Sequence, residues 1–179
     1  MQQPLYGLIG GKLGHSYSKI IHEKIADYTY ELLPLPTEAE ARTFMERRAF
    51  AAINVTIPYK QFVIPYCDVV DPKAQAIGAV NTIVNRDGKL YGYNTDYAGF
   101  AYLAGAHGVD FAGKTVLVLA PGASLAEEAG RNAVAAAKAD CIVSANFCPE
   151  FCQPDYAFFT NSKRFEKLDL AALPCPVVL

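Results

Sequence analysis

The sequence predicts an α/β protein of two domains, in which short apolar strands alternate with helices. Short apolar runs recur along the chain and end at Gly or Pro, as buried strands do. Segments with apolar residues at helical spacing lie between these runs. In the second half, an apolar run precedes a Gly-containing loop and an Ala-rich segment, which is typical of a βαβ unit in a parallel sheet.

The first elements follow from these patterns in chain order. Residues 5–9 predict a strand that two glycines stop. Isoleucines recur at helical spacing within residues 16–28 and predict a helix. Residues 28–35 predict a second strand, which two prolines end. Thr37 and Glu40 have the spacing of a capping box, so we expect a second helix to begin there.

Five further elements complete the first half. Residues 51–55 predict a third strand, and the proline that follows begins a helix or a turn. An Asp-Pro pair begins a short helix within residues 71–77. Residues 79–85 and 89–93 predict a hairpin, because an Asp-Gly turn lies between them. Residues 96–106 predict a helix that His-Gly ends.

The second half begins with a strand at residues 115–119, which we expect to be buried on both faces. An Ala-rich helix and a strand at residues 140–144 follow, which together start a doubly wound sheet. We place the domain boundary between residues 100 and 112. The predicted domains are residues 1–105 and 106–179.

Charge and hydropathy exclude several classes of partner. The net charge is −2 and no Lys/Arg stripe is present, which argues against nucleic acid and anionic membranes. The first residues lack the basic and apolar parts of a signal peptide, and no apolar stretch is long enough to cross a bilayer. We therefore expect a cytoplasmic protein.

The cysteines predict free thiols. Their number is odd and their spacing irregular, which is not a disulfide framework. Cys148 and Cys152 are close enough to suggest half of a metal site. No second pair of Cys or His has zinc-site spacing, so no metal site is predicted. The five are Cys67, Cys141, Cys148, Cys152 and Cys175.

Two motifs place polar side chains at the ends of predicted elements. Ser16 and Ser18 begin a helix, where hydroxyls and free N–H groups suit an anion, although serine there is also an ordinary helix cap. Asn54, Thr56 and Lys60 follow a buried strand, where loops often carry sites. Lys60 is either a proton-transfer group or a surface lysine after a turn.

Two more motifs follow along the chain. Asn81 lies in the segment GAVNT, and its side-chain amide must form hydrogen bonds with the backbone or with a ligand. Asp96 lies in the segment YNTDYAGF, where it either caps a helix or acts as an acid or base. A lysine beside a carboxylate forms a coupled pair that can share a proton.

The order of the segments GHSYS, NVTIPYK, GAVNT and YNTDYAGF resembles the shikimate dehydrogenase family over residues 1 to about 100. The resemblance implies an N-terminal substrate-binding α/β domain followed by a partial Rossmann-like doubly wound domain. It also implies an oxidoreductase that interconverts shikimate and 3-dehydroshikimate with NADP(H), in the shikimate pathway of aromatic amino-acid biosynthesis.

The same resemblance assigns roles to the polar residues. It implies that Ser16 and Ser18 hold the shikimate carboxylate, and that Lys60 and Asp96 form the acid–base pair. The residues implied to bind ring hydroxyls are Asn54, Thr56, Asn81 and Asp96.

The second half departs from the family at the cofactor loop. Residues 120–124 read APGAS and keep one of three glycines of the family's GAGGAS, and Pro121 removes a backbone donor. The candidate NADP-binding residues are Gly122, Ala123 and Ser124. The alternative function is therefore a catalytically impaired shikimate- or quinate-binding fragment, or a regulatory paralogue, that has lost cofactor binding.

Three other departures bear on the site and on its partners. Lys12 and Lys19 stand where the family usually has prolines, both near the carboxylate end. No Arg follows the second strand to bind the 2′-phosphate of NADP. The later strands expected of the second domain have no counterpart in the chain. We therefore expect that a homodimer or a complementing chain covers the sheet edges, that the fold is reduced, or that the sequence is a fragment.

Overall fold

The computed structural model describes residues 4–14, 16–119, 135–145, 153–158 and 177–178. Helices and strands are mixed, and parallel strands are present, which confirms the predicted α/β class. The chain divides into two compact units, Met1–Gly99 (unit 1) and Phe100–Leu179 (unit 2).

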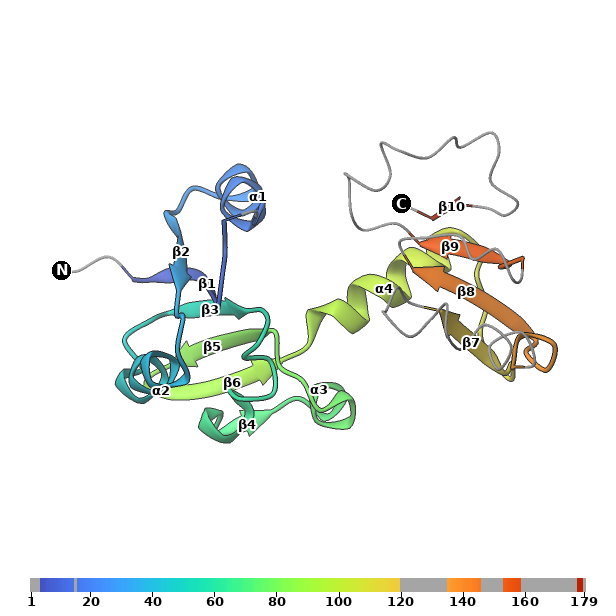
Figure 1. Cartoon of the computed structure of the whole chain (residues 1–179). Coiled ribbons are helices and arrows are strands. Elements are labelled where there is room, and N and C mark those ends of the chain that lie inside the picture. The colour runs from blue at the N-terminus through green and yellow to red at the C-terminus, as the bar shows by residue number, and fades with distance from the viewer. Residues whose placement is uncertain (1–3, 15, 120–134, 146–152, 159–176, 179) are drawn as a thin grey trace. The chain divides into compact units, whose positions relative to one another are not determined.

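Unit 1 contains a mixed sheet of six strands (Figure 1). β1 pairs in parallel with β2 and with β3, whereas β5 pairs antiparallel with β3 and with β6. The short β4, which the sequence did not predict, pairs in parallel with β6. In sheet order the strands are β2 (Tyr30–Pro34), β1 (Tyr6–Gly10), β3 (Ala52–Val55), β5 (Thr82–Arg86), β6 (Lys89–Tyr93) and β4 (Val69–Val70).

Two helices of unit 1 begin at the predicted caps. The Thr37 hydroxyl accepts a hydrogen bond from the Glu40 N–H, and the Glu40 carboxylate accepts one from the Thr37 N–H, which confirms the capping box of α2. The Asp71 carboxylate accepts the Lys73 N–H at 2.9 Å and begins α3. The helical elements are α1 (Ser18–Ile25), α2 (Glu38–Arg47), a 3-10 turn (Ile64–Tyr66), α3 (Pro72–Ile77) and α4 (Thr95–Ala106).

The hairpin of β5 and β6 turns at the predicted residues. Asp87 and Gly88 have φ angles of 53° and 84°, so both adopt the left-handed conformation that a two-residue hairpin turn requires. The Asn85 side chain accepts the Gly88 N–H at 2.8 Å and supports the turn. β5 begins at Thr82, so residues 79–81 lie before the strand instead of within it.

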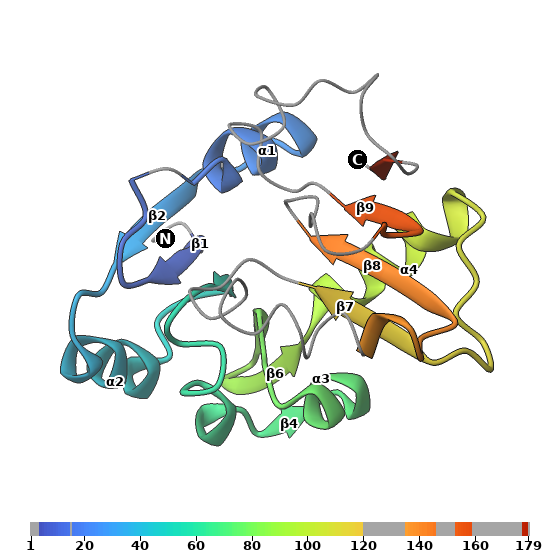
Figure 2. The same ribbon diagram turned by 45° about the vertical axis from the view of Figure 1, so that its right-hand side comes forward.

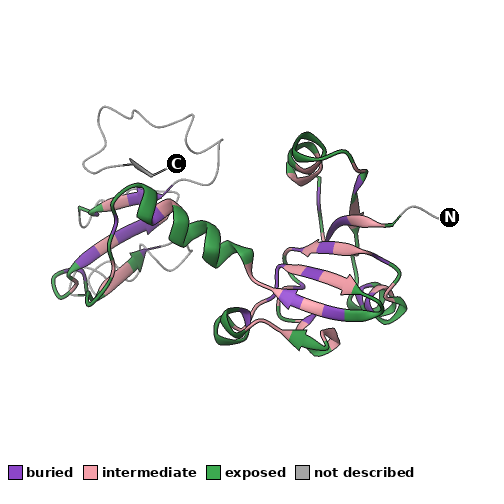
Figure 3. Cartoon of the chain, turned by 180° about the vertical axis from the view of Figure 1, so that it is seen from behind, coloured by how far each residue is buried: buried purple, intermediate pink, exposed green. Residues whose placement is uncertain are grey.

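The sheet of unit 1 has two different faces, because side chains alternate along each strand. On one face, α2 and α3 cover the main core, which contains the fully buried Ile9, Met45 and Ile83. The other face carries a smaller cluster around Leu8 and Tyr30. Buried and less buried residues alternate along the strands in Figure 3.

Helix α1 is shorter and more exposed than its sequence suggests. It begins at Ser18 instead of Ser16, and none of its residues is buried. Ile20, Ile21 and Ile25 are 55%, 52% and 75% exposed, so their helical spacing does not correspond to a buried face in unit 1.

Unit 2 contains a parallel sheet in the order β10-β9-β8-β7 (Figure 2). The expectation of a β7 buried on both faces is wrong, because only Leu119 is buried and Val118 is 61% exposed. The Ala-rich helix lies mostly outside the described residues. β7 is Val116–Leu119, β8 is Cys141–Ala145, β9 is Tyr156–Phe158 and β10 is Val177–Val178, and the last two were not predicted.

Two of the cysteines can be placed in this fold. Cys67 and Cys141 are free thiols, and Cys148, Cys152 and Cys175 lie outside the described residues. Burial raises the pKa of the Cys67 thiol to about 11. Among the described helices, none combines the length and the apolar composition needed to span a membrane.

Candidate active site

The four sequence motifs meet at one edge of the unit 1 sheet. Because β1 and β3 are parallel neighbours, residues 10–18 and 56–60 both leave the sheet at their carboxyl ends. β5 runs the other way, with Thr82 opposite Asn54, so the start of β5 lies at this edge too. Thr82 is also opposite Tyr93 at the end of β6, which brings in the start of α4.

A pocket of about 400 Å³ opens at this edge. Gly10 is needed beside it, because a Cβ there would lie only 2.5 Å from Cγ2 of Thr56. The structure therefore brings the predicted residues Ser16, Ser18 and Thr56 around one space. The complete lining is Leu8, Lys12, Leu13, Gly14, Ser16, Ser18 and Thr56.

Ser16 and Ser18 form a hydrogen-bonded pair at the start of α1. The Ser16 hydroxyl donates to Oγ of Ser18 at 3.1 Å and accepts the Ser18 N–H at 3.2 Å. The N-cap position is Tyr17, whose side chain makes no capping bond. With Ser16 acting as the donor, the Ser18 hydroxyl proton can be directed to a bound acceptor.

Lys60 and Asp96 form an ion pair, with 2.5 Å between Nζ and Oδ2. The two side chains are 31% and 60% exposed, so the pair is accessible to a ligand. Asp96 is not the cap of α4. Asn94 takes that role, because its Oδ1 accepts the Tyr97 N–H at 3.1 Å and its amide donates to the Ala79 carbonyl. The carboxylate of Asp96 is therefore left to Lys60, as the acid–base interpretation requires.

Asn54 and Asn81 belong to one side-chain network on the sheet. Tyr30 donates to Oδ1 of Asn54 at 2.6 Å, and Nδ2 of Asn54 donates to the Thr82 hydroxyl at 3.1 Å. Thr82 then donates to Oδ1 of Asn81 at 3.0 Å, which also accepts the Thr95 N–H at 2.8 Å. Nδ2 of Asn81 donates to the Thr95 hydroxyl. The Asn81 amide is thus satisfied largely within the protein.

Sequence reasoning missed three members of this network: Tyr30, Thr82 and Thr95. Thr82 and Thr95 lie next to predicted residues within the same motifs. Their position beside Asn81 and Asp96 in the sequence could therefore have indicated them. Tyr30 had no such signal, because a tyrosine in an apolar strand is an ordinary core residue. Burial raises the pKa of Tyr30, which keeps its hydroxyl protonated and able to donate.

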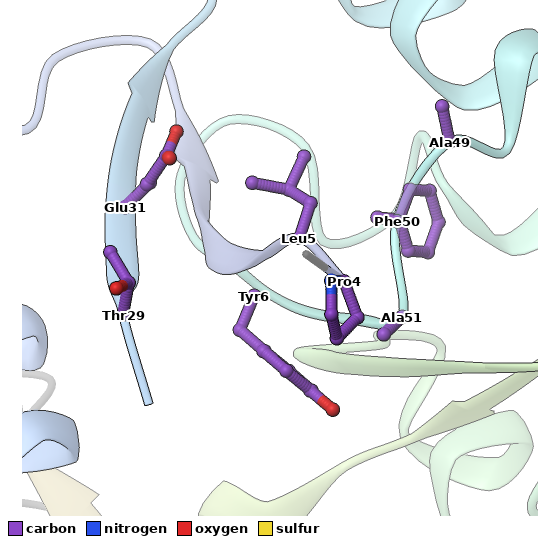
Figure 4. A pocket seen from close by; sticks show the side chains of 8 residues that line it. All are labelled: Pro4, Leu5, Tyr6, Thr29, Glu31, Ala49, Phe50 and Ala51. Atoms are coloured by element: carbon purple, nitrogen blue, oxygen red, sulfur yellow. The ribbon is translucent and has the colours of Figure 1, made fainter. Parts of the chain in front are cut away.

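A second hollow, of about 680 Å³, lies at the opposite ends of the strands (Figure 4). Its lining includes Tyr6 and Glu31 near the starts of β1 and β2, and Ala51 just before β3. None of the predicted site residues lines it. Ligands of parallel sheets bind outside the carboxyl ends of the strands, so the smaller pocket is the better candidate site.

The predicted cofactor residues Gly122, Ala123 and Ser124 lie outside the described residues. The parallel pair β7 and β8 on either side of that stretch fits the first unit of a dinucleotide-binding sheet. In the described part of the chain, no group of three His, Cys, Asp or Glu side chains could hold a metal ion.

Comparison with known proteins matches this site to one family. The model of the shikimate dehydrogenase substrate binding domain matches residues 8–83. Shikimate dehydrogenase (NADP(+)) of Clostridium perfringens strain SM101 is 43% identical over 125 residues, covering 66% of this chain and 46% of that protein. The Moorella thermoacetica enzyme of the same name is 39% identical over 182 aligned positions, covering 97% and 58%.

Solved structures agree with the sequence comparisons. Shikimate 5-dehydrogenase from Thermus thermophilus, in complex with NADP(H) and shikimate, superposes with a TM-score of 0.60 and 27% identity. The match covers 89% of this chain and 69% of that structure. This chain spans about half the length of the curated relatives that it matches. Its motifs, its fold and these matches make the chain similar to the shikimate dehydrogenases, and the match to their substrate binding domain extends over residues 8–83.

Proposed function

We propose that this chain binds shikimate or 3-dehydroshikimate in unit 1 and takes part in their interconversion with NADP(H). The observation that supports this most directly is the accessible Lys60–Asp96 ion pair, with 2.5 Å between its charged atoms. An alcohol oxidation must remove a proton from the hydroxyl, and a coupled lysine–carboxylate pair can hold or release that proton.

The proposed roles of the residues follow from the chemistry of each group. A bound nicotinamide would supply the hydride chemistry, as acceptor for the alcohol carbon or as donor to the ketone. In the reducing direction, the Lys60 ammonium donates a proton to the oxygen of the former ketone. In the oxidising direction, the neutral amine of Lys60 takes the hydroxyl proton. Asp96 holds Lys60 in place through their ion pair.

The remaining candidate residues would orient the substrate. The Ser18 hydroxyl can donate to a carboxylate while Ser16 holds it through their hydrogen bond, and Thr56 lies on the same pocket. Asn54 and Asn81 each keep one amide N–H beyond the described network, which suits a ring hydroxyl. Fixed donors of this kind hold the reacting carbon and oxygen in position.

The test is turnover of shikimate with NADP, followed by the absorbance of the reduced nicotinamide. We expect Lys60→Ala to lower the rate by about 100-fold or more, because general acid–base groups contribute about 10²–10⁴-fold. Arg42→Ala, which removes an exposed ion pair with Glu38, is the control and should keep full activity. Equal rates for wild type and Lys60→Ala would refute the acid–base role.

A second candidate function is shikimate or quinate binding without catalysis. It is favoured by Pro121, which lacks the backbone N–H that a phosphate-binding loop uses. In that case shikimate should raise the melting temperature while no reduced cofactor forms. If neither shikimate nor quinate binds the wild-type chain, both functions are refuted.

The organisation of the protein is part of the proposal. We assign residues 1–105 to substrate binding and residues 106–179 to a partial Rossmann-like domain in a cytoplasmic enzyme. We also propose that the chain assembles with a second copy of itself or with a complementing chain. Light scattering of the purified chain, alone and mixed with a separately expressed second half of a relative, measures this assembly.

A further inference from the structure

The pocket at the carboxyl ends of β1 and β3 contains one charged group, Lys12, among the described residues that line it. The other polar groups of that lining are the hydroxyls of Ser16, Ser18 and Thr56. No acidic side chain is part of this described lining. The space is therefore bordered by a cation and by hydroxyl donors, which is a chemistry that favours an anion.

Lys12 also differs from the other lysines near the site in its pairing. Lys19 donates to the Glu23 carboxylate and to the Tyr30 carbonyl, and Lys60 is paired with Asp96. Lys12 takes part in none of the ion pairs formed by the described residues. Its charge is thus the one on this pocket that no described carboxylate compensates.

The geometry of the serine pair complements this charge. Ser16 donates to Ser18, and the Ser18 hydroxyl proton can then reach a ligand oxygen. A carboxylate has two oxygens, so it can accept from Ser18 and face the Lys12 ammonium at the same time. A neutral ester of the same acid could accept from Ser18 but would gain little from the ammonium.

We propose that Lys12 is a specificity-determining residue, which selects an anionic ligand in this pocket by placing its ammonium beside the carboxylate bound by Ser16 and Ser18. This rests on the proposed function, since the carboxylate is taken to be that of shikimate. Because Lys12 is exposed, its replacement should leave the fold intact.

The test compares the binding of shikimate and of its uncharged methyl ester by titration calorimetry. For Lys12→Ala we expect the Kd of shikimate to rise about tenfold, which corresponds to about 1.4 kcal/mol. The Kd of the methyl ester should change by less than about twofold, because a neutral ester has no negative charge for the Lys12 ammonium to attract. Lys24→Ala removes an exposed lysine of α1 that does not line the pocket, and should change neither Kd.

Ionic strength provides a second measurement. Raising salt from about 50 to about 500 mM should weaken shikimate binding more in the wild type than in Lys12→Ala, because salt screens exposed charge pairs. Equal Kd values for shikimate in the two proteins would overturn the role of Lys12 and leave the proposed function standing. An equal loss for acid and ester would also overturn it. Failure of the wild-type chain to bind shikimate would overturn the proposed function itself.

Discussion

Replacing Tyr30 by Phe tests whether the buried tyrosine fixes the orientation of Asn54. The substitution removes one hydroxyl and keeps the ring, so it creates almost no cavity. Tyr30 is 2% exposed, and its hydroxyl donates to Oδ1 of Asn54 at 2.6 Å. Without that donor, Oδ1 loses its partner in the described network while Nδ2 still bonds to Thr82.

The expected loss in the free energy of unfolding depends on how buried the Tyr30–Asn54 hydrogen bond is. A typical intramolecular hydrogen bond contributes about 1 kcal/mol net, and an acceptor left buried and unpaired costs about 1–3 kcal/mol. Asn54 is only partly buried, so water can replace part of the lost bond. We therefore expect Tyr30→Phe to lower the free energy of unfolding by about 1–2 kcal/mol. In an Asn54→Ala background the same change should cost less than about 0.5 kcal/mol, because no acceptor remains.

Urea unfolding followed by far-ultraviolet circular dichroism measures these values, since the chain contains no Trp for fluorescence. Tyr102→Phe is the matched control, because Tyr102 is 78% exposed and its loss of a hydroxyl should be neutral. Binding supplies a functional readout: Tyr30→Phe should weaken shikimate binding without changing the charge of the site. An equal loss of stability in the wild-type and Asn54→Ala backgrounds would refute the coupling between the two residues.

Two further predictions concern ionisable groups of unit 1. Hydrogen bonds from the Leu90 backbone and the Arg48 side chain lower the pKa of Asp68 below its usual 3.8. Its stabilising effect is therefore complete above that value and is lost as the pH falls through the lowered pKa. The gap in melting temperature between wild type and Asp68→Asn should be full at about pH 6 and narrow only as the pH falls below the usual pKa of 3.8, and a gap independent of pH would contradict this. The Cys67 pKa of about 11, against a usual 9.0, lowers its thiolate fraction at about pH 8 by about 100-fold. Peptide mapping after iodoacetamide should show correspondingly slower alkylation of Cys67 in the folded than in the urea-unfolded chain, and equal rates would refute the effect of burial.

Local signals predicted the elements whose ends are determined by short-range chemistry. The capping box at Thr37, the cap at Asp71 and the turn at Asp87–Gly88 all act within a few residues, so the sequence contained their full cause. Apolar spacing was less reliable for burial. The isoleucines of α1 and Val118 of β7 satisfy the patterns of buried elements and are still exposed, because burial depends on what packs against a segment.

The polar residues of the site likewise include some that the sequence could identify and some that only the structure revealed. Lys60 and Asp96 were identified by residue type and motif, and each kept an ordinary alternative at that stage. The sequence allowed Asp96 to be the cap of α4. In the structure Asn94 caps this helix instead, and the Asp96 carboxylate pairs with Lys60. Tyr30, Thr82 and Thr95 could not be found from spacing, since their connection to Asn54 and Asn81 depends on strand pairing.

The sequence by itself determined the α/β class, the caps and turns, and the motifs that relate this chain to the shikimate dehydrogenase family. These depend on interactions among neighbours in the chain, which a sequence contains directly. Only the tertiary structure decided which motifs meet and what each side chain contacts. Lys60 and Asp96 are 36 residues apart, and Tyr30 and Asn54 are 24 apart. Their encounter requires the register of β2, β1, β3, β5 and β6, which packing of the whole sheet fixes.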